Sequence, residues 1–127
     1  MYFHGYTSAK ENTELYKTLI NNIATNVDDR LHRDQAANAS GIIVNTTGWI
    51  DGDGFTLLLH AIERLHIDVV LVMGHDKLYS NLVTSLAGAV KSVAVVKLPR
   101  SGGVVSRVSI LYLHILVYFC IFLCVWW

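Results

Sequence analysis

The chain has 127 residues, which is enough for one domain with a modest hydrophobic core. Ten Lys and Arg residues balance ten Asp and Glu residues, so no overall charge favours nucleic acid and any anionic ligand has to be bound locally. Both cysteines, Cys120 and Cys124, lie in the apolar C-terminal stretch, which argues against a disulfide framework and fits a reducing compartment.

The first part of the chain predicts a short extended piece, a long helix and a strand. Residues 1–5 are aromatic and strand-like, and Thr7 or Ser8 can cap the helix that follows. Apolar residues recur at helical spacing and predict an amphipathic helix over residues 12–33. The apolar stripe consists of Leu15, Leu19, Ile20, Ile23, Val27 and Leu31. After a polar segment, residues 40–45 form a β-branched run without alternation, which predicts a strand buried on both faces.

Two further pairs of helix and strand follow in the sequence. Residues 55–65 predict a helix with one apolar side, and residues 67–73 predict a second buried strand. Residues 76–87 predict the next helix, and residues 93–98 predict a third strand that ends before Pro99. This alternation is typical of an α/β fold with a parallel sheet and right-handed crossovers, although the strands are few for a complete sheet.

The C-terminal residues 108–127 differ in composition from the rest of the chain, because they contain no Lys, Arg, Asp or Glu. About 20 apolar residues can cross a bilayer as a helix, so the pattern predicts a helical apolar tail. Arg100 and Arg107 precede the tail and Trp126 and Trp127 close it, as in a membrane tail anchor. A second interpretation is that the tail is the translation of a readthrough or a shifted frame. Composition does not separate the two.

A glycine-rich loop over residues 45–54 joins the first strand to the second helix and is the main candidate for a binding site. In α/β sheets, ligands collect at the carboxyl ends of the strands. Trp49 can stack on a nucleic-acid base, a contact worth about 1–3 kcal/mol. The alternative is a tryptophan packed under its own loop, with Asp51 or Asp53 capping the helix, and spacing alone favours this alternative.

The remaining polar residues give weaker signals. Arg100 and Arg107 flank a glycine pair and can clamp a phosphate, although solvated arginines are commoner. The histidines have no metal-binding spacing; we expect His60 to be structural, whereas His75 follows a strand end where ligands collect. The sequence contains no Gly-Lys-Ser or Gly-Lys-Thr phosphate loop, no nucleophile elbow and no dinucleotide fingerprint.

Short motifs in a fixed order resemble a known family. They are Tyr2-Phe3-His4-Gly5, Asn12 to Leu15-Tyr16-Lys17, Ala39-Ser40-Gly41, Asn45-Thr46-Thr47-Gly48-Trp49-Ile50-Asp51-Gly52, Asp68-Val69-Val70, Lys77-Leu78-Tyr79 and Leu98-Pro99-Arg100-Ser101-Gly102-Gly103-Val104-Val105. Together they resemble the polynucleotide 5'-hydroxyl kinase subunit of the pre-mRNA cleavage and polyadenylation machinery. The resemblance covers residues 2–107. It implies that residues 1–107 are the second half of a P-loop kinase domain, with a partial P-loop NTPase-like parallel sheet of three to four strands and an unrelated tail at residues 108–127.

The resemblance implies a function in RNA processing. The full-length family phosphorylates RNA 5'-hydroxyl ends with ATP and magnesium, in nuclear mRNA 3'-end processing and in tRNA splicing. The implied partners are RNA and subunits of the cleavage and polyadenylation factor or of the tRNA splicing machinery, and the implied location is the nucleus. A membrane becomes a partner only if the apolar tail is a genuine anchor.

The resemblance also implies roles for individual residues. The family's Thr-x-Gly-Trp clasp, whose tryptophan is expected to stack on RNA bases, falls on Thr46, Gly48 and Trp49. The family's lid carries two arginines five residues apart that hold the transferring phosphate. The first falls on Arg107, and the second falls on Tyr112, which is not an arginine.

Departures from the family pattern limit the expected activity. The family's phosphate loop and magnesium-binding motif correspond to sequence before Met1, so ATP and magnesium are not expected to bind well to this chain. Phosphoryl transfer depends mostly on positioning and charge stabilisation, and we therefore expect a truncated member of the family that is inactive by itself. The alternatives are an RNA-binding or scaffold remnant and a tail-anchored small α/β protein. Strands without their neighbours would leave an exposed sheet edge.

Overall fold

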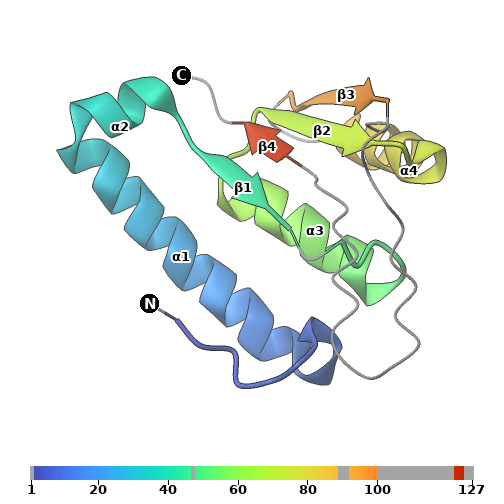
Figure 1. Ribbon diagram of the computed structural model, residues 1–127, viewed down its shortest axis with the longest axis horizontal. Helices are drawn as coiled ribbons and strands as arrows, with labels where there is room; N and C mark the ends of the chain where they lie inside the picture. The colour runs from blue at the N-terminus through green and yellow to red at the C-terminus, as the bar shows by residue number, and fades with distance from the viewer. Residues whose placement is uncertain (1, 47, 89–91, 100–121, 125–127) are drawn as a thin grey trace.

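The computed structural model shows an α/β fold in which helices pack on a four-stranded sheet (Figure 1). It describes residues 2–46, 48–88, 92–99 and 122–124. The sheet has the order β1-β4-β2-β3, with β1 (Ile43–Asn45), β2 (Val69–Met73), β3 (Ala94–Leu98) and β4 (Phe122–Cys124). The helices are η1 (Ala9–Glu11), α1 (Thr13–Arg33), α2 (Gln35–Ser40), α3 (Asp53–Arg64) and α4 (Asp76–Leu86).

Helix α1 confirms the amphipathic helix expected over residues 12–33. Its cap differs from the expectation: the side chain of Asn12 accepts a hydrogen bond from the Leu15 amide at 2.9 Å. Ser8 instead caps the short 3-10 turn η1 in a capping box with Glu11. Residues 2–5, which read as strand-like, form neither strand nor helix.

The short helix α2 was not expected, because its sequence is polar and lacks an apolar stripe. The carboxylate of Asp34 explains its formation, since Oδ1 accepts hydrogen bonds from the amides of Ala36 at 3.0 Å and Ala37 at 3.1 Å. This satisfies two amides that the first helical turn leaves without intrahelical partners. A single capping residue before an alanine-containing run is therefore enough to start the helix.

The sheet confirms the parallel arrangement expected for the first three strands. Strands β2 and β3 pair in parallel from Val69 opposite Ala94 to Met73 opposite Leu98. Strands β1 and β2 each pair antiparallel with β4, so they run parallel to one another. The burial expected for β1 is wrong: the side chain of Ile43 is 66% exposed, because β1 is the outermost strand on its side of the sheet.

The helix expected for the apolar tail is wrong at residues 122–124, the part of the tail that the structure describes, because these residues form strand β4. Phe122–Cys124 lies between β1 and β2 and pairs antiparallel with both. An extended segment there supplies backbone partners to two strands at once, which a helix cannot do. The rest of residues 108–127 lies outside the described residues. Within the described ranges, no helix is both long enough and apolar enough to span a bilayer.

The hydrophobic core joins α1, α3 and α4 to β2. Helices α1 and α3 lie side by side, and α4 lies alongside β3 (Figure 1). The core cluster consists of Ala24, Leu58, Ala61, Ile62, Leu65, Ile67, Val70, Val72, Leu78 and Leu82. Its most deeply buried members include Val70 and Val72 of β2 and Leu82 of α4, each 0% exposed. Burial of these side chains fixes the helices on the sheet.

Replacing Leu82 with alanine tests the contribution of α4 to this core. We expect Leu82→Ala to lower the free energy of unfolding by about 2–5 kcal/mol, because it removes buried methyl groups and leaves a cavity. The matched control is Val83→Ala at the next position, where the side chain is 42% exposed and the change should stay within about 0.5 kcal/mol. Urea denaturation followed by circular dichroism measures both, and equal losses would contradict the assignment of the core.

Candidate nucleic-acid interface

The loop between β1 and α3 turns sharply at Gly52. The backbone of Gly52 has φ 54° and ψ −122°, a conformation that side-chain-bearing residues rarely adopt. The Gly54 amide donates to the carbonyl of Asp51 at 3.0 Å, which closes the turn. Gly48 also has a positive φ of 69°. The glycines of the loop thus bring the chain from the end of β1 directly to the start of α3.

Trp49 packs against the first turn of α3 at Gly54. A Cβ atom at Gly54 would lie 2.6 Å from the indole atoms Cγ and Cδ2, and closer still to the carbonyl oxygen of Trp49. Only glycine fits this position without displacing the tryptophan. The interpretation that Trp49 packs under its own loop is therefore right for part of the ring, but the residue is half-buried and not enclosed.

A cation lies over the same tryptophan. The Lys10 ammonium nitrogen is 5.0 Å from the centroid of a Trp49 ring, within the range of a cation–π interaction. Lys10 is an exposed residue of η1, far from Trp49 in the sequence. No motif or spacing in the sequence points to this contact. The sequence predicted a site made of loop residues alone, and the fold brings the positive charge of Lys10 next to it.

Thr46 and Trp49 line a common, narrow cavity against α3 and Tyr16. Its volume is about 20 Å³, which accommodates a water molecule but no base. A ligand at this loop must therefore lie on the outer surface of Trp49. The structure brings Thr46, Gly48 and Trp49 together on one loop, whereas Arg107 lies outside the described residues.

The two carboxylates of the loop do not cap α3. Gly52 is the N-cap residue, and no side chain makes a capping hydrogen bond there. The alternative that Asp51 or Asp53 caps the helix is therefore wrong. Both residues are exposed, and Asp53 lies in the first turn of α3, where a negative charge interacts favourably with the helix dipole.

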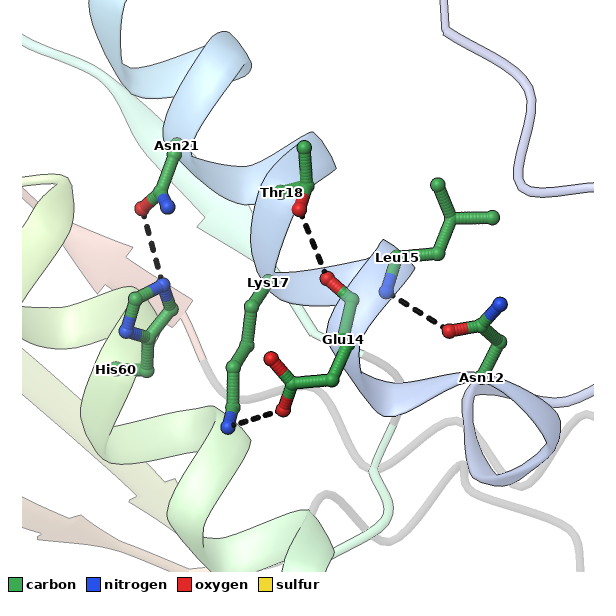
Figure 2. A network of polar contacts seen from close by, with 7 residues as sticks. All are labelled: Asn12, Glu14, Leu15, Lys17, Thr18, Asn21 and His60. Atoms are coloured by element: carbon green, nitrogen blue, oxygen red, sulfur yellow. Dashed lines mark hydrogen bonds and ion pairs between the residues drawn. The ribbon is translucent and has the colours of Figure 1, made fainter.

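His60 has the structural position expected for it. Its Nε2 lies 3.0 Å from Oδ1 of Asn21, and Figure 2 shows the two side chains pointing toward one another from α3 and α1. The same Oδ1 accepts a hydrogen bond from Nε of Arg64 at 2.9 Å. Asn21 therefore joins α1 to two residues of α3.

The other polar groups have local roles. His75, a candidate for a position near a ligand, accepts a hydrogen bond from the Leu78 amide at 3.0 Å through Nδ1 and caps α4. Lys17 donates to Glu14 at 2.8 Å (Figure 2), and this hydrogen bond lowers the pKa of the Glu14 carboxyl. In the part of the chain that the structure describes, no three His, Cys, Asp or Glu side chains gather as a metal site would require.

Comparison with known proteins gives a family match over most of the chain. The family model described as mRNA cleavage and polyadenylation factor CLP1 P-loop matches residues 1–111. A Protein CLP1 homolog of Arabidopsis thaliana is 44% identical over 109 residues, which is 86% of this chain and 24% of the relative. The Dictyostelium discoideum homolog is 39% identical over 106 residues, 84% of this chain and 23% of the relative. The chain thus spans about a quarter of the length of these curated relatives, and the loop lies within the matched stretch.

Replacing Gly54 with alanine tests the packing of Trp49. We expect Gly54→Ala to displace the indole, to lower the free energy of unfolding by about 1–3 kcal/mol and to shift the Trp49 emission toward longer wavelength. Tryptophan fluorescence in a background with Trp126→Phe and Trp127→Phe reports on Trp49 alone. Gly88→Ala is the control, because nothing lies within 4 Å of the added Cβ atom. Unchanged emission in Gly54→Ala would contradict the packing.

Proposed function

Because the chain belongs to the CLP1 P-loop family of mRNA cleavage and polyadenylation factors, we propose that it acts in mRNA processing by holding single-stranded RNA on the loop of Trp49. The observation that carries this proposal is the pair formed by the Trp49 indole and the Lys10 ammonium group. Proteins that bind single-stranded nucleic acid combine aromatic stacking surfaces with positive charge along the backbone. Here the loop supplies the aromatic ring of Trp49, and η1 supplies the positive charge of Lys10.

The geometry of the loop favours an end or a short segment of RNA over a duplex. Trp49 is held at one side by Gly54, so it offers a fixed surface on which one unpaired base can stack. Lys10 is exposed and can bind the phosphate next to that base. Net charge is zero, so the rest of the chain adds no general attraction, and this local pair has to determine the binding.

For a full-length protein that contains this chain, we propose the other activities of the family. They are ATP- and magnesium-dependent phosphorylation of RNA 5'-hydroxyl ends, participation in tRNA splicing, association with the cleavage and polyadenylation machinery, and a nuclear location. The residues of this chain do not fit ATP and magnesium, because the sequence contains no Gly-Lys-Ser or Gly-Lys-Thr. Its proposed contribution is to position the RNA.

Removal of the Lys10 charge and the Trp49 ring tests the RNA site. We expect Trp49→Ala to weaken binding of single-stranded RNA by about 1–3 kcal/mol, because a stacking surface is lost. Since Trp49 also packs in the loop, Lys10→Gln is the second variant: it leaves the contact of Trp49 with Gly54 intact and should reduce the slope of log affinity against log salt by about 0.7. Fluorescence anisotropy with labelled RNA measures both.

The control for the RNA site is Lys77→Gln, which removes an exposed lysine from a different element, α4. It should retain the affinity of the unaltered chain. If Trp49→Ala and Lys10→Gln both bind RNA as the unaltered chain does, the loop is not the site. If Lys77→Gln weakens binding as much as Lys10→Gln, the attraction is general and the assignment to Lys10 is wrong.

A kinase assay tests whether the chain acts by itself in catalysis. We expect no phosphorylated product when the purified chain receives ATP, magnesium and RNA with a 5'-hydroxyl end, because a lysine and backbone amides that cradle the phosphates are required. Transfer of labelled phosphate to the RNA is the measurement. Turnover that persists after repeated purification would overturn the proposal that this chain only positions RNA.

A further inference from the structure

A short turn carries Lys10 to its position over Trp49. Lys10 is the middle residue of η1, a 3-10 helix of three residues. The carboxylate of Glu11 closes this turn, because its Oε1 accepts hydrogen bonds from the Ser8 amide at 3.1 Å and from the Thr7 hydroxyl at 2.8 Å. The Lys10 amide in turn donates to Oγ of Ser8 at 3.3 Å. The backbone of Lys10 is thus part of a network that ends on one carboxylate oxygen.

The segment around η1 is held on α1 at both of its ends. At one end, Oδ1 of Asn12 accepts the capping hydrogen bond of α1. At the other end, Nε2 of His4 lies 3.3 Å from the carbonyl oxygen of Asn12, and the His4 ring meets the ring of Tyr16 edge-on with centroids 5.9 Å apart. Residues 5–11 therefore form a loop with fixed ends, and the direction of Lys10 depends on how this loop is closed.

The contact between Lys10 and Trp49 is too weak to close the loop by itself. Lys10 is exposed, and a cation–π contact at an exposed position contributes less than several hydrogen bonds of which two end on an ionised carboxylate. Glu11 is exposed as well, so its negative charge opposes the binding of a phosphate near Lys10. A carboxylate in this place is unfavourable for an RNA site unless it has another role, and the capping box supplies that role.

We propose that Glu11 is a positioning residue for the RNA site. Its side chain holds η1 in the conformation that places the Lys10 ammonium nitrogen 5.0 Å from the centroid of a Trp49 ring, next to the phosphate of a stacked nucleotide. Glu11 acts through its hydrogen-bond acceptor and not through its charge, because a capping box forms with Glu and Gln alike. The effect on RNA rests on the proposed function, whereas the placement of Lys10 does not.

Two substitutions of equal charge test the role of Glu11. Glu11→Gln removes the negative charge and keeps an oxygen acceptor for the turn, whereas Glu11→Ala removes both. We expect Glu11→Gln to bind single-stranded RNA at least as tightly as the unaltered chain. Glu11→Ala should bind RNA about threefold more weakly than Glu11→Gln, with a slope of log affinity against log salt that is smaller by up to about 0.7. Lys10→Gln should weaken binding more in the Glu11→Gln background than in the Glu11→Ala background, as fluorescence anisotropy with labelled RNA would show.

A measurement without RNA tests the placement of Lys10 separately. When the Lys10 side chain lies over the indole, the ring current of Trp49 shifts the side-chain proton signals of Lys10 upfield in nuclear magnetic resonance spectra. We expect this shift in the unaltered chain and in Glu11→Gln. It should be lost in Glu11→Ala, and its loss in Trp49→Ala identifies the ring that causes it.

The matched control for the loss of a cap is Asp34→Ala. Like Glu11→Ala it removes one carboxylate and one helix cap, but it does so at the other end of α1, where Asp34 caps α2. It should bind RNA as Glu11→Gln does and should keep the proton shift of Lys10. Circular dichroism and thermal unfolding of the variants show that they remain folded.

The proposal is overturned if Glu11→Ala keeps the proton shift of Lys10, or if Glu11→Gln loses it as Glu11→Ala does. It is also overturned if Glu11→Ala and Glu11→Gln bind RNA equally while the unaltered chain binds it. If the shift behaves as expected and the unaltered chain binds no RNA, the proposed function fails and takes the RNA role of Glu11 with it, whereas the placement of Lys10 by Glu11 stands. The two failures are therefore distinguishable.

Discussion

The fold depends on the burial of β2. Val70 and Val72 are 0% exposed, and the backbone of β2 pairs with β3 on one side and with β4 on the other. The core cluster connects this strand to α1, α3 and α4, so each helix is positioned by the same small set of apolar side chains. Because native stability is a small difference between large terms, a core of this size leaves little surplus for irregular segments. In the loop of Trp49, Ile50 packs against this core, and the turn around it is held by local contacts.

Those local contacts explain how the loop of Trp49 can be ordered while its tryptophan is only half-buried. The missing side chain of Gly54 lets α3 begin directly against the indole, and the positive φ of Gly52 directs the chain into that helix. A buried tryptophan would be unable to stack on a ligand, and a free tryptophan would lose conformational entropy on binding. Packing one part of the ring against glycine and leaving Lys10 near its face avoids both costs. The position of the Trp49 ring thus depends on the two glycines, Gly52 and Gly54.

The sequence predicted the regular elements and missed contacts between distant segments. The 3.6-residue period placed α1, and the β-branched runs placed β1, β2 and β3, because burial imposes these patterns along the chain itself. It missed α2, since one Asp34 carboxylate and not a pattern starts that helix. The burial predicted for β1 and the helix predicted for the tail were both wrong. Composition shows which residues are apolar, but it does not show which strand lies at the edge of the sheet or which segment pairs between two strands. The contact between Lys10 and Trp49 joins segments far apart in the sequence, so no local sequence pattern predicts it.

Tyr16 lies between two cavities of the molecule. It lines the narrow cavity under Trp49 and also an apolar groove beside β1, and its burial raises the pKa of its hydroxyl group. A side chain shared by two cavities has to satisfy the packing of both, because a shift toward one leaves space in the other.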